Sequence, residues 1–277
     1  MKLHLIDNGL FKLDGGAMFG VVPQSIWKKQ NEPDANNMCT WAMRSLLIED
    51  SNSLTLIDTG IGTKQDAKFF SHYHLHGDGS LLKSINKAGF EASEITDVFL
   101  THFHFDHVGG AVSRISDQLC PTFANSYYWT NELHLEWAIN PNAREKASFL
   151  RDNILPLLES GQLKFTEKET FDKFEYFKMD GHTEKMMLPK IYYLGQTIVF
   201  VSDLIPSIAH IPLPYVMSYD VRPLTTMVEK KEFLHDAAAN KWILFFQHDS
   251  INECCTVKFS EKGVVVDDIF KLNEIGQ

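Results

Sequence analysis

The chain has 277 residues, of which 44% are hydrophobic and 22% charged, and its formal net charge is −10. These proportions are typical of a globular protein and exclude a disordered, collagen-like or coiled-coil chain. The excess of acids also argues against nucleic acid as a partner, because that interaction depends on clustered Lys and Arg.

The first residues of the sequence and the cysteines indicate in which compartment the protein is expected. The N-terminal residues reach Asp7 before an apolar run forms, and the longest apolar stretches, such as residues 242–246, are too short to span a bilayer. We therefore expect a cytoplasmic protein that does not act at a membrane. The four cysteines have no C-x-x-C spacing, which indicates reduced thiols rather than a disulfide framework or zinc finger.

The first half of the chain opens with strand-like segments. Strands are predicted at residues 3–12, 39–49, 54–58 and 95–101, and helices at residues 81–88, 131–140 and 142–160. Pro141 separates the last two helices, and Pro156 predicts a kink in the second. Residues 14–23 are rich in glycine and are expected to form a flexible loop.

The second half repeats the plan of a hairpin that ends in an acid. Its predicted strands are residues 163–166, 174–179, 187–194, 197–201 and 242–247, followed by a hairpin over residues 257–269 around Gly263. A helix capped by Thr225 or Thr226 is expected to reach Asn240. No Ser/Gly/Pro-rich linker divides the sequence, so we predict one α/β domain over residues 1–277.

The chemistry is concentrated in residues 101–110, T-H-F-H-F-D-H-V-G-G. In an extended stretch His102 and His104 share one side, while Asp106 and His107 at the following turn face a neighbouring position. Three His and one Asp within six residues favour two metal ions over a solvated histidine cluster. Imidazoles and carboxylates without a thiolate suit zinc first, with manganese, iron or cobalt as alternatives.

This run resembles the signature of the metallo-β-lactamase superfamily, and four further motifs appear in the superfamily's order. They are Asp58-Thr-Gly60, Gly181-His182-Thr183, Ser202-Asp203 and His248. The resemblance implies a four-layer αββα sandwich of two mixed β-sheets flanked by helices. It also implies two divalent metal ions per chain, the first held by His102, His104 and His182, the second by Asp106, His107 and His248, with Asp203 bridging both.

Two adjacent dications lower the pKa of a shared water and polarise a substrate oxygen, so the expected reaction is hydrolysis by a metal-bridging hydroxide. Asp106, as a ligand and the nearest carboxylate, is the predicted catalytic residue that fixes the nucleophile and passes a proton to the leaving group. Asp58 is expected to orient the metal-binding loops, with a purely structural turn contact as the alternative.

Residues 202–220, together with the loop around Met18 and Phe19, resemble the branch that holds N-acyl-homoserine lactonases and methyl-parathion-type hydrolases. The predicted substrate is therefore a lactone or activated ester with an apolar portion, and the resemblance implies a homodimer. Many such lactonases carry Tyr three residues after the bridging Asp, where this chain has Pro206. His210, Tyr215 or Tyr219 is the hypothetical replacement donor. Met18, Phe19, Phe105 and His210 are the candidate substrate residues, and simple core packing is the alternative for Met18, Phe19 and Phe105.

Other functions stay open at this point. A thioester hydrolase of the glyoxalase II kind and an organophosphate triesterase are the main alternatives, and metal stoichiometry separates both from a single-iron persulfide oxygenase. A non-catalytic ligand-binding protein on this scaffold would not need every ligand of two metals. Residues 72–76, H-Y-H-L-H, are interpreted as an exposed loop rather than another metal site, because no Asp-His follows them.

Overall fold

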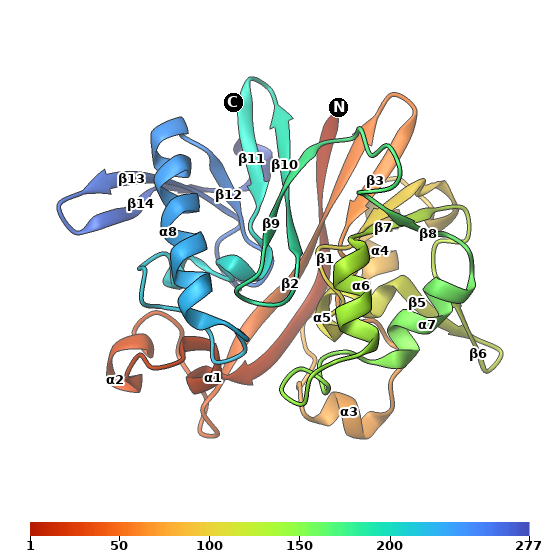
Figure 1. Ribbon diagram of the computed structural model, residues 1–277, viewed down its shortest axis with the longest axis horizontal. Coiled ribbons are helices and arrows are strands. Elements are labelled where there is room, and N and C mark those ends of the chain that lie inside the picture. Colours follow the sequence, from red (N-terminus) through yellow and green to blue (C-terminus); the bar gives the residue numbers. More distant parts are fainter. Residues whose placement is uncertain (277) are drawn as a thin grey trace. The chain divides into compact units, whose positions relative to one another are not determined.

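Two six-stranded sheets carry the fold in the computed structural model, which describes residues 1–276 (Figure 1). The first sheet has the order β1-β2-β3-β4-β7-β8. Its strands are β1 (Lys2–Asp14), β2 (Met38–Asp50), β3 (Ser53–Ile57), β4 (Asp97–Phe99), β7 (Tyr127–Thr130) and β8 (Leu163–Phe165). The pair β2 and β3 is antiparallel, whereas β3, β4, β7 and β8 run parallel, so the sheet is mixed.

The second sheet has the order β14-β13-β12-β11-β10-β9. Its strands are β9 (Glu175–Met179), β10 (Met186–Tyr193), β11 (Gln196–Phe200), β12 (Ile243–Phe245), β13 (Cys254–Ser260) and β14 (Gly263–Phe270). Only β11 and β12 pair in parallel, and the other neighbours are antiparallel. The predicted hairpins therefore form, within one to three residues of their expected bounds.

Contacts between residues divide the chain into two units, one of Met1–Leu10 and Met43–Asp172, the other of Phe11–Ala42 and Lys173–Gln277. The boundary falls within β1 and β2, which belong to both units. Each unit thus contains one of the two acid-terminated hairpins expected from the sequence. The single domain over residues 1–277 stays a prediction.

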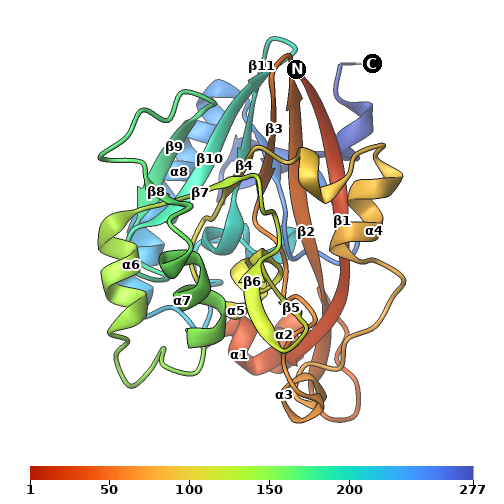
Figure 2. The ribbon, with the colours of Figure 1, turned by 90° about the vertical axis from the view of Figure 1, so that its right-hand side faces the viewer.

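Helices bury their apolar faces against the sheet of the first unit. They are α4 (Leu81–Lys87), α5 (Phe105–Val108), α6 (Glu132–Ile139) and α7 (Arg151–Glu159), beside a small hairpin of β5 (Val112–Ile115) and β6 (Gln118–Pro121). Helix α3 (Ala67–Ser71) has no buried residue, and its Phe69 contacts Phe105 of α5. Ile85 of α4, Leu135 of α6 and Leu157 of α7 share a buried cluster with Leu56 and Val98 of the sheet. The three helices can be followed by their labels in Figure 2. Burial of this apolar area is the main stabilising contribution to the unit.

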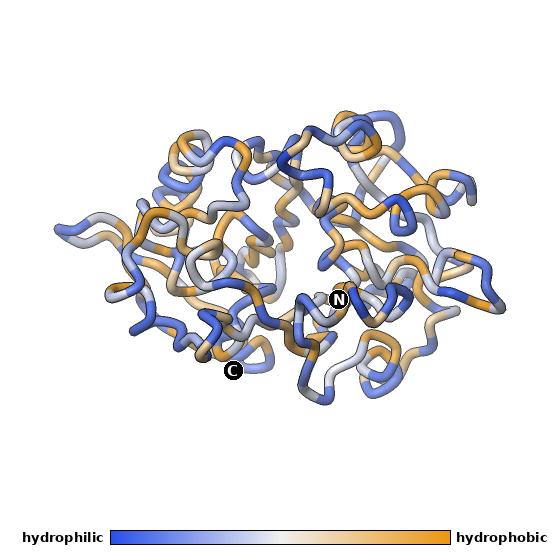
Figure 3. The backbone as a smooth tube through the Cα atoms, turned by 90° about the horizontal axis from the view of Figure 1, so that it is seen from below, coloured by the Kyte–Doolittle hydropathy of each residue, from blue (hydrophilic) through white to orange (hydrophobic). Residues whose placement is uncertain are grey.

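The second unit is covered by α8 (Pro223–Asn240), whose Phe233, Leu234 and Ala237 pack against Leu188 and Leu244 of the sheet. In Figure 3 the hydrophilic colour marks the tip between β13 and β14 at the left edge of the view. Helix α8 begins at Pro223 rather than at a Thr cap, since proline at the first helical position lacks only an N–H that has no helical partner there.

Two expectations about local structure were wrong. The helix predicted over residues 142–160 forms only as α7, because the Asn142 side chain accepts the backbone N–H groups of Arg144 and Glu145 and holds that stretch in turns. The glycine-rich stretch expected as a loop contains α1 (Gly15–Phe19), capped by the Asp14 carboxylate, and α2 (Gln24–Trp27) follows.

Two further sequence inferences concern membranes and thiols. Across residues 1–276, no helix combines the length and apolarity needed to cross a membrane. Cys39, Cys120 and Cys255 are free thiols, and Cys39, Cys254 and Cys255 are buried.

Candidate metal centre

In the first unit the four potential ligands lie at the start of α5. His102 and His104 precede the helix in extended backbone, and Asp106 and His107 occupy its first turn. All four side chains are buried, which is unusual for this many polar groups in so short a segment. These four polar side chains therefore lie in the interior of the unit.

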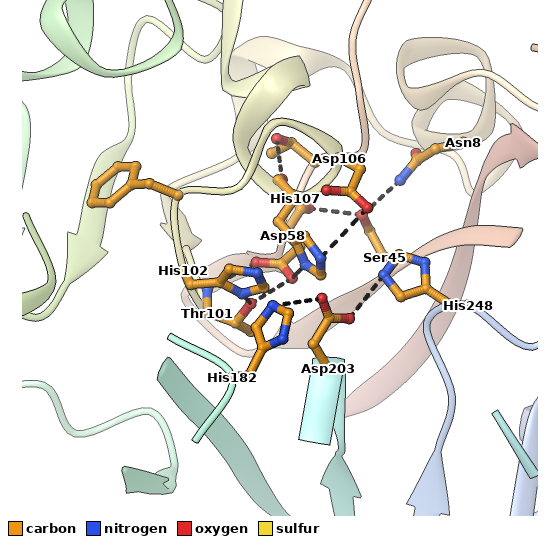
Figure 4. Close-up of polar contacts among 12 residues, drawn as sticks. Asn8, Ser45, Asp58, Thr101, His102, Asp106, His107, His182, Asp203 and His248 are labelled. Carbon is orange, nitrogen blue, oxygen red and sulfur yellow. Dashed lines mark hydrogen bonds and ion pairs between the residues drawn. The ribbon is translucent and has the colours of Figure 1, made fainter. Parts of the chain in front are cut away.

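Asp58 organises this segment through three hydrogen bonds. Its carboxylate accepts the Thr101 backbone N–H and hydroxyl, both at 2.8 Å, and His107 Nδ1–H at 2.9 Å (Figure 4). Asp58 itself sits just after β3 with φ of 55°, a conformation that only a tightly held residue maintains. Because a carboxylate only accepts when ionised, Nδ1 of His107 carries the proton and Nε2 keeps its lone pair for a metal. Asp58 therefore orients the ligand loop.

Gly109 and Gly110 let α5 lie directly against the turn after Asp58. A Cβ on Gly109 would come within 2.1 Å of the Ile61 carbonyl oxygen, and one on Gly110 within 2.2 Å of the Thr59 carbonyl oxygen. The two glycines in the sequence after His107 are thus required by this close approach.

In the second unit a single carboxylate lies between two imidazoles. Asp203, in a 3₁₀ turn directly after β11, places Oδ2 3.0 Å from His182 Nε2 and Oδ1 3.0 Å from His248 Nε2 (Figure 4). His248 follows β12, and its Nδ1–H donates to the Ala42 carbonyl at 2.8 Å. His182 Nδ1–H donates to Asp220 at 2.9 Å. Each ring thus presents its Nε2 to a different oxygen of Asp203.

This arrangement fits metal ions. His107, His182 and His248 each have Nδ1 held by an oxygen acceptor, the pattern that fixes a metal-ligating histidine and leaves Nε2 to coordinate. Burial lowers the pKa of His182, but the charges and hydrogen bonds of Asp203 and Asp220 outweigh burial and raise its pKa to about 10. The pocket therefore favours a positive charge at this point.

The His and Asp side chains that could hold a metal ion form two sets among the described residues. The first unit contributes His102, His104, Asp106 and His107, and the second contributes His182, Asp203 and His248. Both sets consist of borderline nitrogen and hard oxygen donors, which suit a dinuclear centre of divalent ions.

The candidate substrate residues are placed differently from the expectation. Met18 and Phe19 lie in α1 with 2% and 0% exposed, and the Phe19 ring stacks on Trp27 and His210 at 5.2 Å and 4.7 Å. His210 uses both ring nitrogens, since Nε2–H donates to the Met18 carbonyl and Nδ1 accepts from Ser207. The hypothesis that His210 is a free donor to substrate is thus not supported. These three residues form packed core in the second unit.

Phe105, the residue before Asp106, belongs to an aromatic cluster. Its ring contacts Tyr73 at 4.6 Å and Phe69 at 5.4 Å, so that the end of α3 and the segment after it form an aromatic cluster with α5. Burial, with a contribution from the charge of Asp106, raises the pKa of Tyr73 to about 12, which keeps its hydroxyl protonated. The sequence interpretation of residues 72–76 as a bare exposed loop missed Tyr73.

Asp220 was missed as well. It is 38 residues from the histidine it holds, and no local motif surrounds it. Glu145 was also missed, and its Oε1 lies 3.5 Å from His104 Nε2. Neither residue can be identified as a partner of a histidine without knowledge of the fold.

Comparison with known proteins identifies the family. The model of the metallo-β-lactamase superfamily matches residues 44–248, and the chain belongs to this superfamily. The predicted family and the predicted fold of two mixed sheets flanked by helices are confirmed.

Solved structures share the fold over nearly the whole chain. A probable metal-dependent hydrolase from Staphylococcus aureus has a TM-score of 0.88 and 26% identity, covering 99% of this chain and 98% of that one. AidC, a dizinc quorum-quenching lactonase in complex with a product, has a TM-score of 0.76 and 25% identity over 96% and 95% of the two chains. The hydrolase AbOPH, at 19% identity with a TM-score of 0.78 and covering 97% and 94% of the chains, shows the fold alone.

Among curated proteins, probable metallo-hydrolases of Mycobacterium tuberculosis and Mycobacterium bovis are 32% identical over 74 residues. The match spans 24% of this chain and 24% of each relative. The chain thus matches about a quarter of the length of these relatives.

Proposed function

We propose that the protein is a metal-dependent hydrolase with a dinuclear centre that opens a lactone or activated ester with an apolar portion. The observation that carries the proposal is the Asp203 carboxylate, whose two oxygens face the Nε2 atoms of His182 and His248 at 3.0 Å each. A carboxylate placed between two imidazoles in this way would help to hold both cations.

The assignment of ligands follows from the order of the superfamily's motifs in the chain. We assign His102, His104 and His182 to one ion, Asp106, His107 and His248 to the other, and Asp203 to both. Zinc is the first choice, since three of these imidazoles already have Nδ1 held by an oxygen acceptor. When bound, two such ions supply a water of lowered pKa and polarise the substrate carbonyl.

The protein's own groups supply position and proton transfer. Asp58 and Asp220 fix the rings of His107 and His182, so these ligands need no reorganisation during the reaction. Asp106 is buried at the start of α5 and, as a carboxylate, can accept the proton of the attacking water and return it to the leaving oxygen.

An apolar substrate portion is favoured by the aromatic cluster of Phe69, Tyr73 and Phe105 beside Asp106. Phe69 and Tyr73 are only half-buried, so they offer apolar surface to a ligand. The dizinc lactonase AidC shares the fold at 25% identity, and N-acyl-homoserine lactone is therefore the first substrate to test.

The test is proton release in a pH-stat when a long-chain N-acyl-homoserine lactone is added to protein loaded with two equivalents of zinc. We expect rapid release that a chelator abolishes and zinc restores. The Asp203→Asn variant, which removes the bridging charge, serves as the matched inactive control. Activity on thioesters or phosphotriesters without lactone turnover would replace the substrate assignment, and no chelator-sensitive hydrolysis of any of them would refute the function.

A further inference from the structure

A second binding groove lies in the second unit and contains none of the candidate metal ligands. It has a volume of about 750 Å³ and is bounded by α8, the β13–β14 hairpin and the segment of residues 208–215. Figure 1 shows α8 running beside β13 and β14. The volume is that of a small-molecule pocket.

The floor of this groove is apolar. Ile211 and Leu234 are buried beneath it, residues 264–266 are three half-buried valines along β14, and Phe259 is 54% exposed at its side. Covering such a surface with an alkyl chain is favourable, because it removes apolar area from water. Sugars and other strongly polar ligands would gain little from contact with this apolar surface.

The charges that line the groove have one sign. Lys231 and Lys262 line it, together with His235, whose Nδ1 lies 3.3 Å from Asp236. No Asp or Glu among residues 1–276 lines it, although the chain has 36 acids against 26 Lys and Arg. Lys231 and Lys262 have no ion pair among residues 1–276, whereas Lys258 on the same hairpin is paired with Asp267 at 2.7 Å. The groove therefore complements an anion.

Apolar floor and cationic groups lie side by side on α8. Lys231, Leu234 and His235 are spaced three and four residues apart, so they share one face of the helix. From the groove's size, apolar floor and positive charge, we propose that it binds a free medium-chain fatty acid. The alkyl chain covers Leu234 and the valines of β14, and the carboxylate pairs with Lys231 and Lys262.

The groove is built before any ligand binds. Lys230 is buried in α8, and its ammonium donates to the carbonyl oxygens of His210, Pro212 and Tyr215 at 3.0, 3.1 and 2.8 Å. These bonds fix the 208–215 wall to the helix. A fixed wall lowers the entropic cost of binding.

The experiment is calorimetric titration of the zinc-loaded protein with decanoate, repeated after chelation. We expect one site whose affinity is the same in both states, because no candidate metal ligand lines the groove. The double variant Lys231→Glu/Lys262→Glu should weaken binding at least tenfold. The control Lys83→Glu/Lys87→Glu changes net charge equally on exposed positions of α4 and should bind as the wild type does.

Two further titrations test the alkyl part. Octanoate lacks two methylenes and should bind roughly tenfold more weakly than decanoate. Val264→Asp places a carboxylate in the groove and should abolish binding. Decanoate binding that disappears on chelation would locate the ligand at the metal centre and overturn the proposal. Equal decanoate affinity in both double variants would also overturn it. No decanoate binding, together with self-association that Val264→Asp disrupts, would overturn it too and would assign the groove to a second copy of the chain.

Discussion

Single acceptor oxygens decide how the ligands of the centre are presented. Asp58, Asp220 and the Ala42 carbonyl each hold the Nδ1–H of one histidine. An imidazole held in this way has a fixed tautomer and a fixed ring plane. Two of the three acceptors are carboxylates, whose charge also makes the ring a better ligand.

We expect Asp220→Asn to lower zinc affinity by about 10- to 100-fold, because the amide removes the charge that supports His182 and can hold the wrong tautomer. The measurement is competition for zinc with a chromophoric chelator, alongside circular dichroism to verify the fold. Asp172→Asn, an exposed change of the same kind, is the control. Equal zinc affinity in both variants would show that Asp220 does not support a ligand.

His210 gives a prediction about pH. Burial lowers its pKa to about 4, with smaller effects from the Met18 carbonyl and from the charges of Lys230, Asp249 and Asp203. The unfolded value is near 6.5, so between pH 6.5 and 4 the unfolded chain binds more protons than the folded one. The free energy of unfolding is therefore at its full value, as far as His210 is concerned, above pH 6.5. It falls by about 3 kcal/mol as the pH falls towards 4.

Urea denaturation of the chelated protein at pH 7, 5.5 and 4.5 measures this effect. His210→Gln has no titrating ring and should show a smaller loss of unfolding free energy over this range than the wild type. His235→Gln, at an exposed position of α8, should keep the wild-type slope. If the slopes of all three proteins coincide, His210 does not titrate in this window.

At the scale of elements, the contact between α5 and the turn after β3 allows no side chain. We expect Gly109→Ala to cost about 3 kcal/mol or more, since its Cβ would meet the Ile61 backbone at 2.1 Å and α5 must move. Gly161→Ala meets no atom within 4 Å and has only a positive φ of 73° to adopt, which costs about 1 kcal/mol. Equal losses of unfolding free energy in urea would contradict a tight contact at Gly109.

The elements also show what sequence can predict. Short apolar runs of strand-like composition predicted the strands of both sheets, because central strands such as β3, β4 and β12 are buried along nearly their whole length. The same logic failed over residues 142–150, where Asn142 and the buried Glu145 carboxylate bond to nearby backbone and side chains instead of continuing a helix. Periodicity does not register such local competition with helical hydrogen bonds.

For the whole molecule, the order of five short motifs sufficed to predict the family, since each lies at a strand end where the fold needs a polar residue. Supporting residues could not be predicted in this way. Asp220 and Tyr73 act through contacts that the fold creates, and neither lies in a motif. Conversely, the glycine-rich neighbourhood of Met18 and Phe19, and the position of His210 soon after Asp203, suggest substrate contacts, although these three residues pack against one another.

The proposed metal ligands lie far apart in the sequence, from residue 102 to residue 248. A ligand that binds only the folded chain stabilises it by an amount that grows with its free concentration. Zinc at about 1,000 times its dissociation constant should therefore raise the unfolding free energy of the chelated protein by about 4 kcal/mol per independent site. Thermal denaturation with and without two equivalents of zinc measures this effect, and Asp203→Asn should reduce it. An unchanged melting temperature in the wild type would mean that these side chains do not bind zinc, and the proposed function would then lose its chemical basis.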